Sequence, residues 1–147
     1  CFILDRVSKI YIIDLFLQLN VNDDIYINPY LNFVLLWNKG IAFGLLQSEQ
    51  IIYHLITGII LFIIFFLIFL IYKAKKKWEM IYFSLIAGGA LGNFADRIYY
   101  NAVPDFIDLH YKGFHWFTFN IADICITAGI ILYLIFDMFK YKNKENE

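Results

Sequence analysis

Residues 51–72 read IIYHLITGIILFIIFFLIFLIY, a run of 22 residues without a formal charge. About 20 apolar residues in a helix cross a hydrocarbon core of roughly 30 Å, so this stretch predicts a transmembrane helix. The whole chain of 147 residues is 61% hydrophobic and 20% aromatic. This composition excludes an ordinary soluble domain and predicts a single polytopic membrane domain that covers residues 1–147.

Three more segments are candidates for spanning helices. Residues 78–97 and 119–139 are long apolar runs with few charges, and a first helix is expected to run from before residue 1 to about Leu19. Charged residues interrupt this first helix at Asp5, Arg6, Lys9 and Asp14. We expect an all-α membrane protein with four transmembrane helices, the first of them truncated at its N-terminus. The alternative, that Cys1 is the lipidated start of a mature lipoprotein, lacks the polar tether expected there.

The distribution of lysines predicts the orientation of the chain. Lysines gather in the connection at residues 73–77 and in the C-terminal tail, whereas residues 20–50 and 98–118 hold only Lys39 and Lys112. Short loops rich in Lys and Arg stay in the cytoplasm. Both termini and the 73–77 turn are therefore expected in the cytoplasm, and the larger loops outside. The net charge of -1 gives no indication of nucleic-acid binding.

The first outer loop is expected to contain a little β-structure. Residues 30–37 alternate between aromatic and aliphatic side chains after a turn-rich segment, which predicts a short strand. The sequence WNKGIAFG follows at residues 37–44. The simplest interpretation of this segment is a hairpin or a helix-entry turn around Gly40. The Asn38 amide could instead hydrogen-bond to a peptide main chain.

Two acids carry the strongest indication of chemistry. Asp123 lies one turn inside an apolar helix, where an ionisable residue is costly and usually functional. Asp105 is expected on an outer loop, but Val103, Phe106 and Ile107 surround it with apolar side chains and favour a loop that folds inward. An acid on a loop and an acid on a helix could lie close together and share one proton. An aspartyl hydrolase requires such a pair of carboxyl groups. Asp108 is expected to be solvated.

Polar side chains accompany the third and fourth segments. Gly88 and Gly92 form a GxxxG pattern, which lets another helix approach closely. Asn93 and Arg97 are four residues apart and share one helix face, and Asp96 is expected to pair with Arg97 at the outer helix end. In the last segment, three further polar residues are spaced to share one face: Asn120, Asp123 and Thr127.

The histidines and serines do not follow a known catalytic or metal-binding pattern. His54 is expected on a helix, and His110 and His115 in a loop, so no pair is placed as helix-borne haem ligands. Neither HExxH nor Cys-His zinc spacing occurs. No metal and no cofactor are therefore expected. A Ser-Lys protease is also disfavoured, because Ser48 and Ser84 have no neighbouring base.

With these residues in view, the chain resembles the lipoprotein signal peptidases (signal peptidase II). These bacterial inner-membrane aspartyl endopeptidases remove signal peptides from diacylglyceryl-modified prolipoproteins, on the N-terminal side of the lipidated Cys. Five segments carry the resemblance in the family's order: LDRVSK at 4–9, NKGIAF at 38–43, GGALGNFADR at 88–97, VPDFID at 103–108 and FNIAD at 119–123.

The resemblance implies that Asp105 and Asp123 are catalytic and that Asp96 is structural. It implies supporting or substrate-binding roles for Asp5, Asn38, Gly40, Asn93, Arg97 and Asn120. The expected partners are the prolipoprotein substrate and membrane lipids, with the site near the extracytoplasmic face of the inner membrane and the oligomeric state left open. The chain departs from the family pattern at Arg6, Lys39, Ile41 and Pro104.

Two other classes of protein remain as alternatives. A small proton-coupled transporter could also use buried Asp5, Asp105 and Asp123, although four helices without inverted repeats disfavour it. A scaffold protein could use the GxxxG pattern, but it would not need the two acids. Cleavage of a lipobox peptide carrying diacylglyceryl-Cys, and inhibition by globomycin, a cyclic peptide associated with this family, would discriminate among them.

Overall fold

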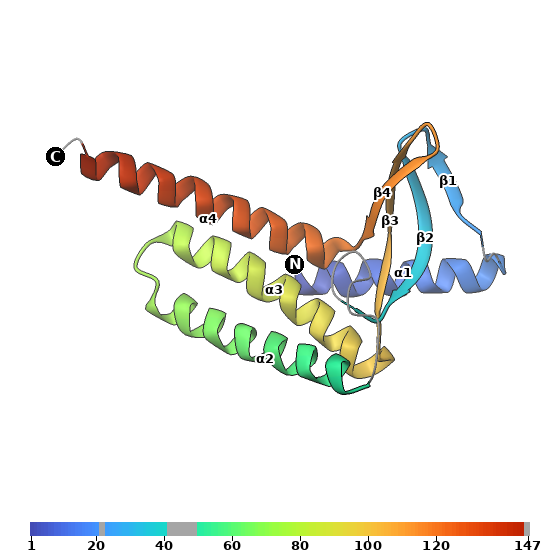
Figure 1. Ribbon diagram of the computed structural model, residues 1–147, viewed down its shortest axis with the longest axis horizontal. Helices are drawn as coiled ribbons and strands as arrows, with labels where there is room; N and C mark the ends of the chain where they lie inside the picture. The colour runs from blue at the N-terminus through green and yellow to red at the C-terminus, as the bar shows by residue number, and fades with distance from the viewer. Residues whose placement is uncertain (21–22, 41–49, 146–147) are drawn as a thin grey trace.

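The computed structural model describes residues 1–20, 23–40 and 50–145 and combines a helical body with a small sheet (Figure 1). The helices are α1 (Phe2–Leu19), α2 (Gln50–Lys73), α3 (Lys77–Tyr100) and α4 (Ile121–Glu145). The strands are β1 (Ile25–Asn28), β2 (Leu31–Asn38), β3 (Val103–Tyr111) and β4 (Phe114–Phe119). The sheet lies at the end of the helical body where α3 ends and α4 begins, and the last turns of α4 lie at the opposite end.

Two of the described helices are long and apolar enough to cross a bilayer: Tyr53–Lys73 within α2 and Ile121–Met138 within α4. They correspond to the spans expected at residues 51–72 and 119–139. The helices α1 and α3 do not meet this criterion of length and hydropathy. The four expected helices are therefore present. Length and apolar composition support a membrane span for two of them, α2 and α4.

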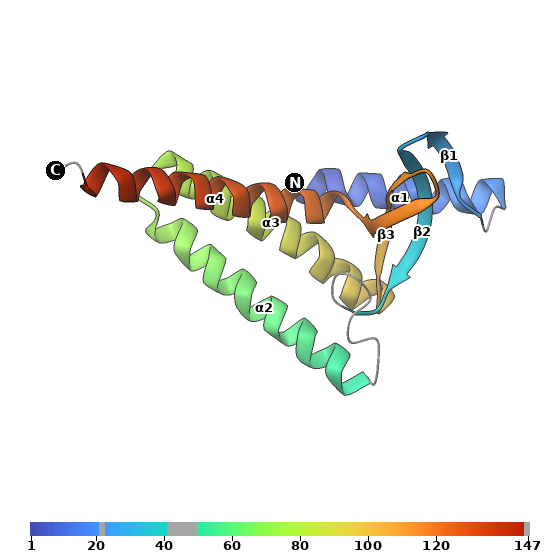
Figure 2. The same cartoon turned by 45° about the horizontal axis from the view of Figure 1, so that its top comes forward.

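Only the first part of α1 lies beside α3. A Cβ atom built on Gly88 would lie 3.2 Å from Cβ of Cys1, and one on Gly92 would lie 2.6 Å from Oδ2 of Asp5. The GxxxG pattern thus lets α1 approach α3, as expected from its small residues. Farther along, α1 leaves the helical body, and its buried Ile12 and Phe16 form the core of the sheet layer with Phe106 (Figure 2).

The sheet is antiparallel with the strand order β1-β2-β3-β4. The strand expected at residues 30–37 is confirmed as β2. The expectation of a loop around Asp105 and Asp108 is wrong, because both lie on β3. Lys112 and Gly113 connect β3 to β4 with φ angles of 48° and 80°. Two central residues with positive φ form the tight turn that suits a β-hairpin.

Gly89 lets α4 approach α3 closely. A Cβ atom built on Gly89 would collide with the backbone oxygen of Ala122 and would lie 2.8 Å from Cγ1 of Ile126. Gly129 makes the reciprocal approach, since its Cβ would lie 2.8 Å from the backbone oxygen of Tyr82. The small residues therefore fix how α4, which carries Asp123, sits against α3.

We expect Gly89→Ala to destabilise the protein by about 1–3 kcal/mol, because the added methyl group meets backbone that cannot rotate away. Thermal unfolding in detergent measures this effect. Gly58→Ala on α2 is the matched control, since a Cβ there meets nothing within 4 Å. Equal melting temperatures for Gly89→Ala and the unmodified protein would contradict the proposed close approach of α3 and α4.

Candidate active site

Asp123 is held by the first turn of α4. Asn120 precedes this helix, and its Oδ1 accepts a hydrogen bond from the backbone N–H of Asp123 at 3.2 Å. In return, Oδ2 of Asp123 accepts from the backbone N–H of Asn120 at 3.1 Å. This reciprocal arrangement is a capping box with Asp in place of Glu. The other oxygen, Oδ1, accepts from Nδ2 of Asn93 at 2.8 Å, so both carboxyl oxygens have a fixed donor.

Asp105 is held by the start of β3. Its neighbour Pro104 is buried and is the second residue of the strand, before the pairing with β4 begins at Ile107, so a missing N–H is tolerated there. Asp105 is 3% exposed, and its Oδ2 accepts a hydrogen bond from Nδ2 of Asn38 at 3.0 Å. The Oδ1 atom accepts from Nδ2 of Asn120. Uncharged amides therefore bind both oxygens of this buried acid.

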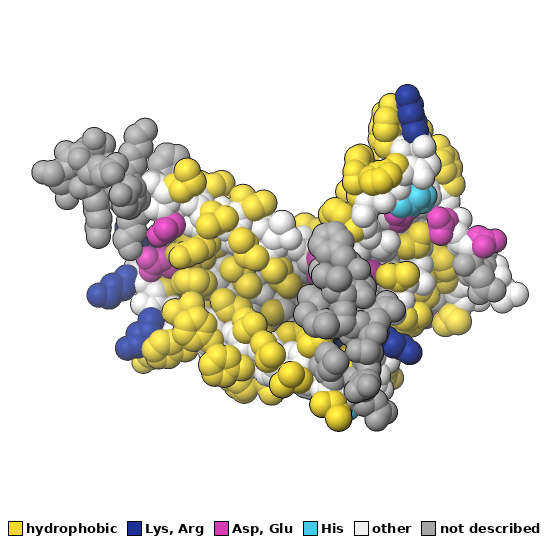
Figure 3. Space-filling model, in the orientation of Figure 1, with side chains coloured by type: hydrophobic (Ala, Val, Ile, Leu, Met, Phe, Trp, Pro, Cys, Tyr) yellow, Lys and Arg dark blue, Asp and Glu magenta, His cyan; other side chains and the backbone are white. Residues whose placement is uncertain are grey.

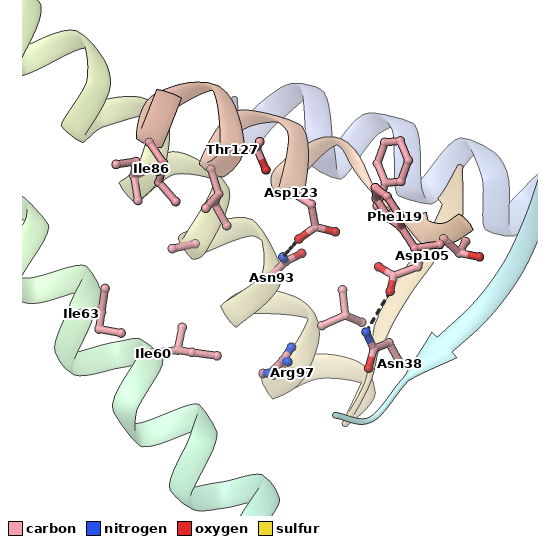
Figure 4. A pocket seen from close by; sticks show the side chains of 16 residues that line it. Asn38, Ile60, Ile63, Ile86, Asn93, Arg97, Asp105, Phe119, Asp123 and Thr127 are labelled. Atoms are coloured by element: carbon pink, nitrogen blue, oxygen red, sulfur yellow. Dashed lines mark hydrogen bonds between the residues drawn. The ribbon is translucent and has the colours of Figure 1, made fainter. Parts of the chain in front are cut away.

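Asn120 joins the two acids. Its side chain donates to Asp105, while its backbone N–H donates to Asp123. Both acids line one cavity of about 630 Å³, and their side chains point into the same space in Figure 4. Apolar side chains from three helices form much of the remaining wall: Ile60 and Ile63 of α2, Ile86 of α3, and Ile126 and Ile130 of α4. The cavity thus places two acids beside a largely apolar wall.

The surroundings of Asp105 favour its protonated form. Burial raises the pKa of Asp105 to about 6; the hydrogen bond from Asn38 opposes this shift, whereas the negative charge of Asp123 adds to it. Two acids beside one cavity resist simultaneous ionisation, because each carboxylate disfavours the charge of the other. The arrangement is therefore suited to hold one proton on the pair up to a pH of about 6.

Arg97 and Gly40 meet beside the two acids. Nη2 of Arg97 donates to the backbone oxygen of Gly40 at 2.6 Å, and the backbone N–H of Gly40 donates to Oδ1 of Asn38 at 2.9 Å. Arg97 also lines the cavity. Its guanidinium thus orients Asn38 through Gly40, and the Asn38 amide is left with its Nδ2 directed at Asp105.

A buried ionic cluster supports the other side of the site. Nζ of Lys9 donates to Oδ2 of Asp5 at 2.9 Å, to Oδ2 of Asp96 at 2.6 Å and to Oδ1 of Asn93 at 2.9 Å. Lys9 and both carboxylates are at most 1% exposed. The bond to Oδ1 of Asn93 leaves the amide nitrogen free to donate to Asp123. Sequence reasoning missed Lys9, although its spacing of four residues from Asp5 on one helix was a usable signal.

The expected ion pair between Asp96 and Arg97 is wrong. In the described part of the chain, the ion pairs of Asp96 are with Lys9 and Arg6, and Nη1 of Arg6 lies 2.6 Å from Oδ1 of Asp96. Adjacent residues of a helix point in different directions, so Asp96 faces α1 while Arg97 faces the cavity. The departure at Arg6 therefore adds a second cation to this cluster.

Asp5 connects α1 to the start of α4. Its Oδ1 accepts a hydrogen bond from the backbone N–H of Ala122 at 2.9 Å, and Asp5 and Ala122 are both fully buried. The first N–H groups of a helix lack partners within the helix, so a carboxylate from a neighbouring helix can satisfy one of them. Asp5 thereby positions the turn that carries Asp123.

An apolar helical body and two amide-bound aspartates beside one cavity, Asp105 buried and Asp123 partly buried, are the features expected of a membrane enzyme of the aspartyl hydrolase class. A family model described as signal peptidase (SPase) II matches residues 1–140. The chain belongs to the signal peptidase II family and is a protease.

Named relatives and solved structures agree with this membership. The chain is 51% identical to the lipoprotein signal peptidase of Pelagibacter ubique over 99% of this chain and 87% of the relative. It is 39% identical to the lipoprotein signal peptidase of Anaplasma phagocytophilum over 93% and 86% of the two chains. The chain also superposes on a solved structure with a TM-score of 0.81 at 34% sequence identity. That structure is described as a bacterial membrane enzyme determined by the in meso method at 2.3 Å resolution. The superposition covers 99% of this chain and 87% of that one.

Proposed function

We propose that Asp105 and Asp123 form the catalytic dyad of a signal peptidase that acts on diacylglyceryl-modified prolipoproteins. The expected cut lies on the N-terminal side of the lipidated Cys. The observation that carries this proposal is the shared hydrogen-bonding of both acids by Asn120 at one end of an apolar cavity. A signal peptide is itself apolar, so the isoleucine-lined part of the cavity suits it.

In the proposed mechanism, the two acids divide the work. The ionised carboxylate takes a proton from water as the water oxygen attacks the scissile carbonyl carbon, while the protonated carboxyl donates to the carbonyl oxygen. Collapse of the tetrahedral intermediate breaks the C–N bond and delivers a proton to the departing amine. Asn38, Asn93 and Asn120 hold both acids with neutral donors, which orient the carboxyl groups and add no net charge to the site.

The site is proposed to lie near the extracytoplasmic face of the inner membrane, in a single membrane domain. Lysines gather at the connection between α2 and α3, which favours the cytoplasm for this end of the helical body (Figure 3). The sheet and the start of α4 lie at the other end. A lipid-modified Cys at the outer interface would then lie level with Asp123.

We further propose that α3 crosses the membrane together with α2 and α4, and that the first turns of α1 lie in the outer half. The acids and cations that lower the hydropathy of α1 and α3 are turned toward each other, as with Asp5, Lys9 and Asp96. The outward side chains of α1 include Ile3 and Leu4, which are 74% and 68% exposed. Apolar side chains also cover much of the helical surface in Figure 3 and would face lipid.

The direct test is cleavage of a synthetic lipobox peptide that carries diacylglyceryl-Cys, using the full chain in detergent micelles. We expect release of a fragment that begins with the lipidated Cys, and inhibition by globomycin. An otherwise identical peptide without the lipid serves as the control. Proton flux in vesicles without any cleavage would overturn the proposal and favour the transporter.

The pKa of Asp105 predicts an alkaline limit to cleavage. Because this pKa is raised to about 6, the dyad loses its last proton as pH rises through this range, and kcat/KM falls. The Asn38 hydrogen bond lowers the pKa, so Asn38→Leu should raise it and move the alkaline limb to higher pH. The pH profile of kcat/KM measures the shift. Gln18→Leu, at an exposed amide, is the control; a limb that stays in place or moves to lower pH in Asn38→Leu would contradict this account.

A further inference from the structure

The hairpin of β3 and β4 brings three metal-binding side chains together. Successive strand residues point to opposite faces, so Asp108 and His110 share one face of β3. The strand register pairs His110 with His115 of β4, directly across the hairpin. One ligand atom from each of Asp108, His110 and His115 lies within 4.8 Å of the others. The three residues are separated in sequence by a turn, and it is the hairpin that makes them a cluster.

The distances centre on one carboxylate oxygen. Nδ1 of His115 lies 2.7 Å from Oδ2 of Asp108, and Nδ1 of His110 lies 3.6 Å from the same oxygen. The two imidazole rings are stacked with their centroids 5.3 Å apart. Ligand atoms about 2.1 Å from a tetrahedral ion lie roughly 3.4 Å from one another, so only small side-chain movements separate this cluster from coordination geometry.

His110 provides an independent indication of a missing partner. It is 8% exposed, and its Nδ1 atom is buried without a hydrogen-bond partner in residues 1–20, 23–40 and 50–145. Buried nitrogen atoms are normally satisfied, and an unpaired one is costly. This nitrogen faces the Asp108 carboxylate, which is 3% exposed. A cation between them would satisfy both groups.

We propose that Asp108, His110 and His115 bind a divalent transition-metal ion of the zinc class. Two imidazoles and one carboxylate match the ligand preference of such ions, whereas Mg²⁺ and Ca²⁺ prefer oxygen ligands. A cavity of about 280 Å³ adjoins Asp108 and His115, and Asp23 and Asp24 also line it. The cavity gives the ion a path from solvent and room for water at a fourth position. On binding, the metal displaces any proton shared by His115 and Asp108.

This site differs from the proposed dyad. Asp105 and Asp108 are three residues apart on β3, and they line different cavities. The metal would join β3 to β4 and so hold together the hairpin whose two ends carry Asp105 and lead into Asn120. In Figure 3, a histidine side chain lies beside acidic side chains on the sheet, at a distance from the helical surface. The role assigned to the ion is therefore structural.

The test is zinc binding by the full chain in detergent micelles after removal of metal with a chelator. Titration with Zn²⁺ against a chromophoric competitor should give one ion per chain. His110→Ala and His115→Ala should each weaken binding by more than about tenfold, since even residues outside the coordination shell cost 10- to 100-fold in other metal sites. His54→Ala is the matched control, because His54 lies on α2, and it is the remaining histidine of the three in the sequence.

The absorption spectrum of bound Co²⁺ provides a second measurement of the same site. Bound Co²⁺ should give the d–d absorption of a four-coordinate nitrogen and oxygen site, and this signal should disappear in His115→Ala, whose side chain is half exposed. Thermal unfolding of the metal-free variants verifies that they remain folded. Zinc binding that survives the double variant His110→Ala/His115→Ala, or that His54→Ala weakens equally, overturns the proposal. Absence of stoichiometric binding by the unmodified chain overturns it as well.

Discussion

Asp105→Asn and Asp123→Asn each lower the rate of signal-peptide cleavage by at least about 10²- to 10⁴-fold, the range associated with loss of a general acid or base. Asparagine has almost the shape of aspartate and can keep a hydrogen bond to the neighbouring amides. It cannot, however, accept a proton from water or donate one as a carboxylic acid does. The loss should therefore appear in kcat, with little change in fold.

Cleavage of the lipobox peptide at saturating concentration measures this effect, and thermal unfolding verifies that each variant is folded. Asp137→Asn is the matched control, because Asp137 is an exposed acid on the same helix as Asp123. It should cleave at the rate of the unmodified enzyme. Near-normal cleavage by a folded Asp105→Asn or Asp123→Asn enzyme would refute the dyad.

Lys9→Met destabilises the protein by about 3–5 kcal/mol, the usual cost when one partner of a buried ion pair is removed. Methionine fills much of the same volume, but it leaves the Asp5 and Asp96 carboxylates without their shared ammonium group. It also removes the donor that fixes Oδ1 of Asn93. We therefore expect cleavage to fall together with stability, because Asn93 then holds Asp123 less firmly.

Unfolding in detergent, followed by circular dichroism, measures the loss for Lys9→Met. Lys77→Met replaces an exposed lysine at the start of α3 and should change stability by less than about 0.5 kcal/mol. Adding Asp96→Asn to Lys9→Met should restore part of the stability, because the two buried carboxylates then no longer share Arg6 as their remaining cation. A Lys9→Met protein as stable as the Lys77→Met control would show that the cluster is not what holds α1 against α3.

The catalytic candidates could be predicted because their local patterns are strong. An acid in the apolar start of a helix is rare, so Asp123 stood out without any knowledge of its partners. The same holds for the helices, whose apolar lengths define residues 51–72 and 119–139 well. The placement of Asp105 beside this acid followed from its apolar neighbours, even though its secondary structure was wrongly expected to be a loop.

Long-range pairing could not be predicted from local pattern. Asp5 bonds to Ala122 from a position 117 residues away, and nothing in either segment specifies the other. In the sequence, Lys9 is a charge that interrupts an apolar helix. Its counterion Asp96 lies on another helix and becomes apparent only in the structure. The strand β3 was missed because it is buried over most of its length, which hides the alternation that marks a half-exposed strand.

Infrared spectroscopy tests the proposed dyad most directly, because it detects the C=O band of a protonated carboxyl group. It therefore reports whether Asp105 and Asp123 together hold one proton. With isotope-labelled aspartate at a pH below about 6, we predict one carboxylic-acid C=O band that changes in either asparagine variant and disappears as the pH rises through this value. Two fully ionised aspartates at a pH below about 6, or a band that neither substitution changes, would contradict the shared proton on which the proposed chemistry rests.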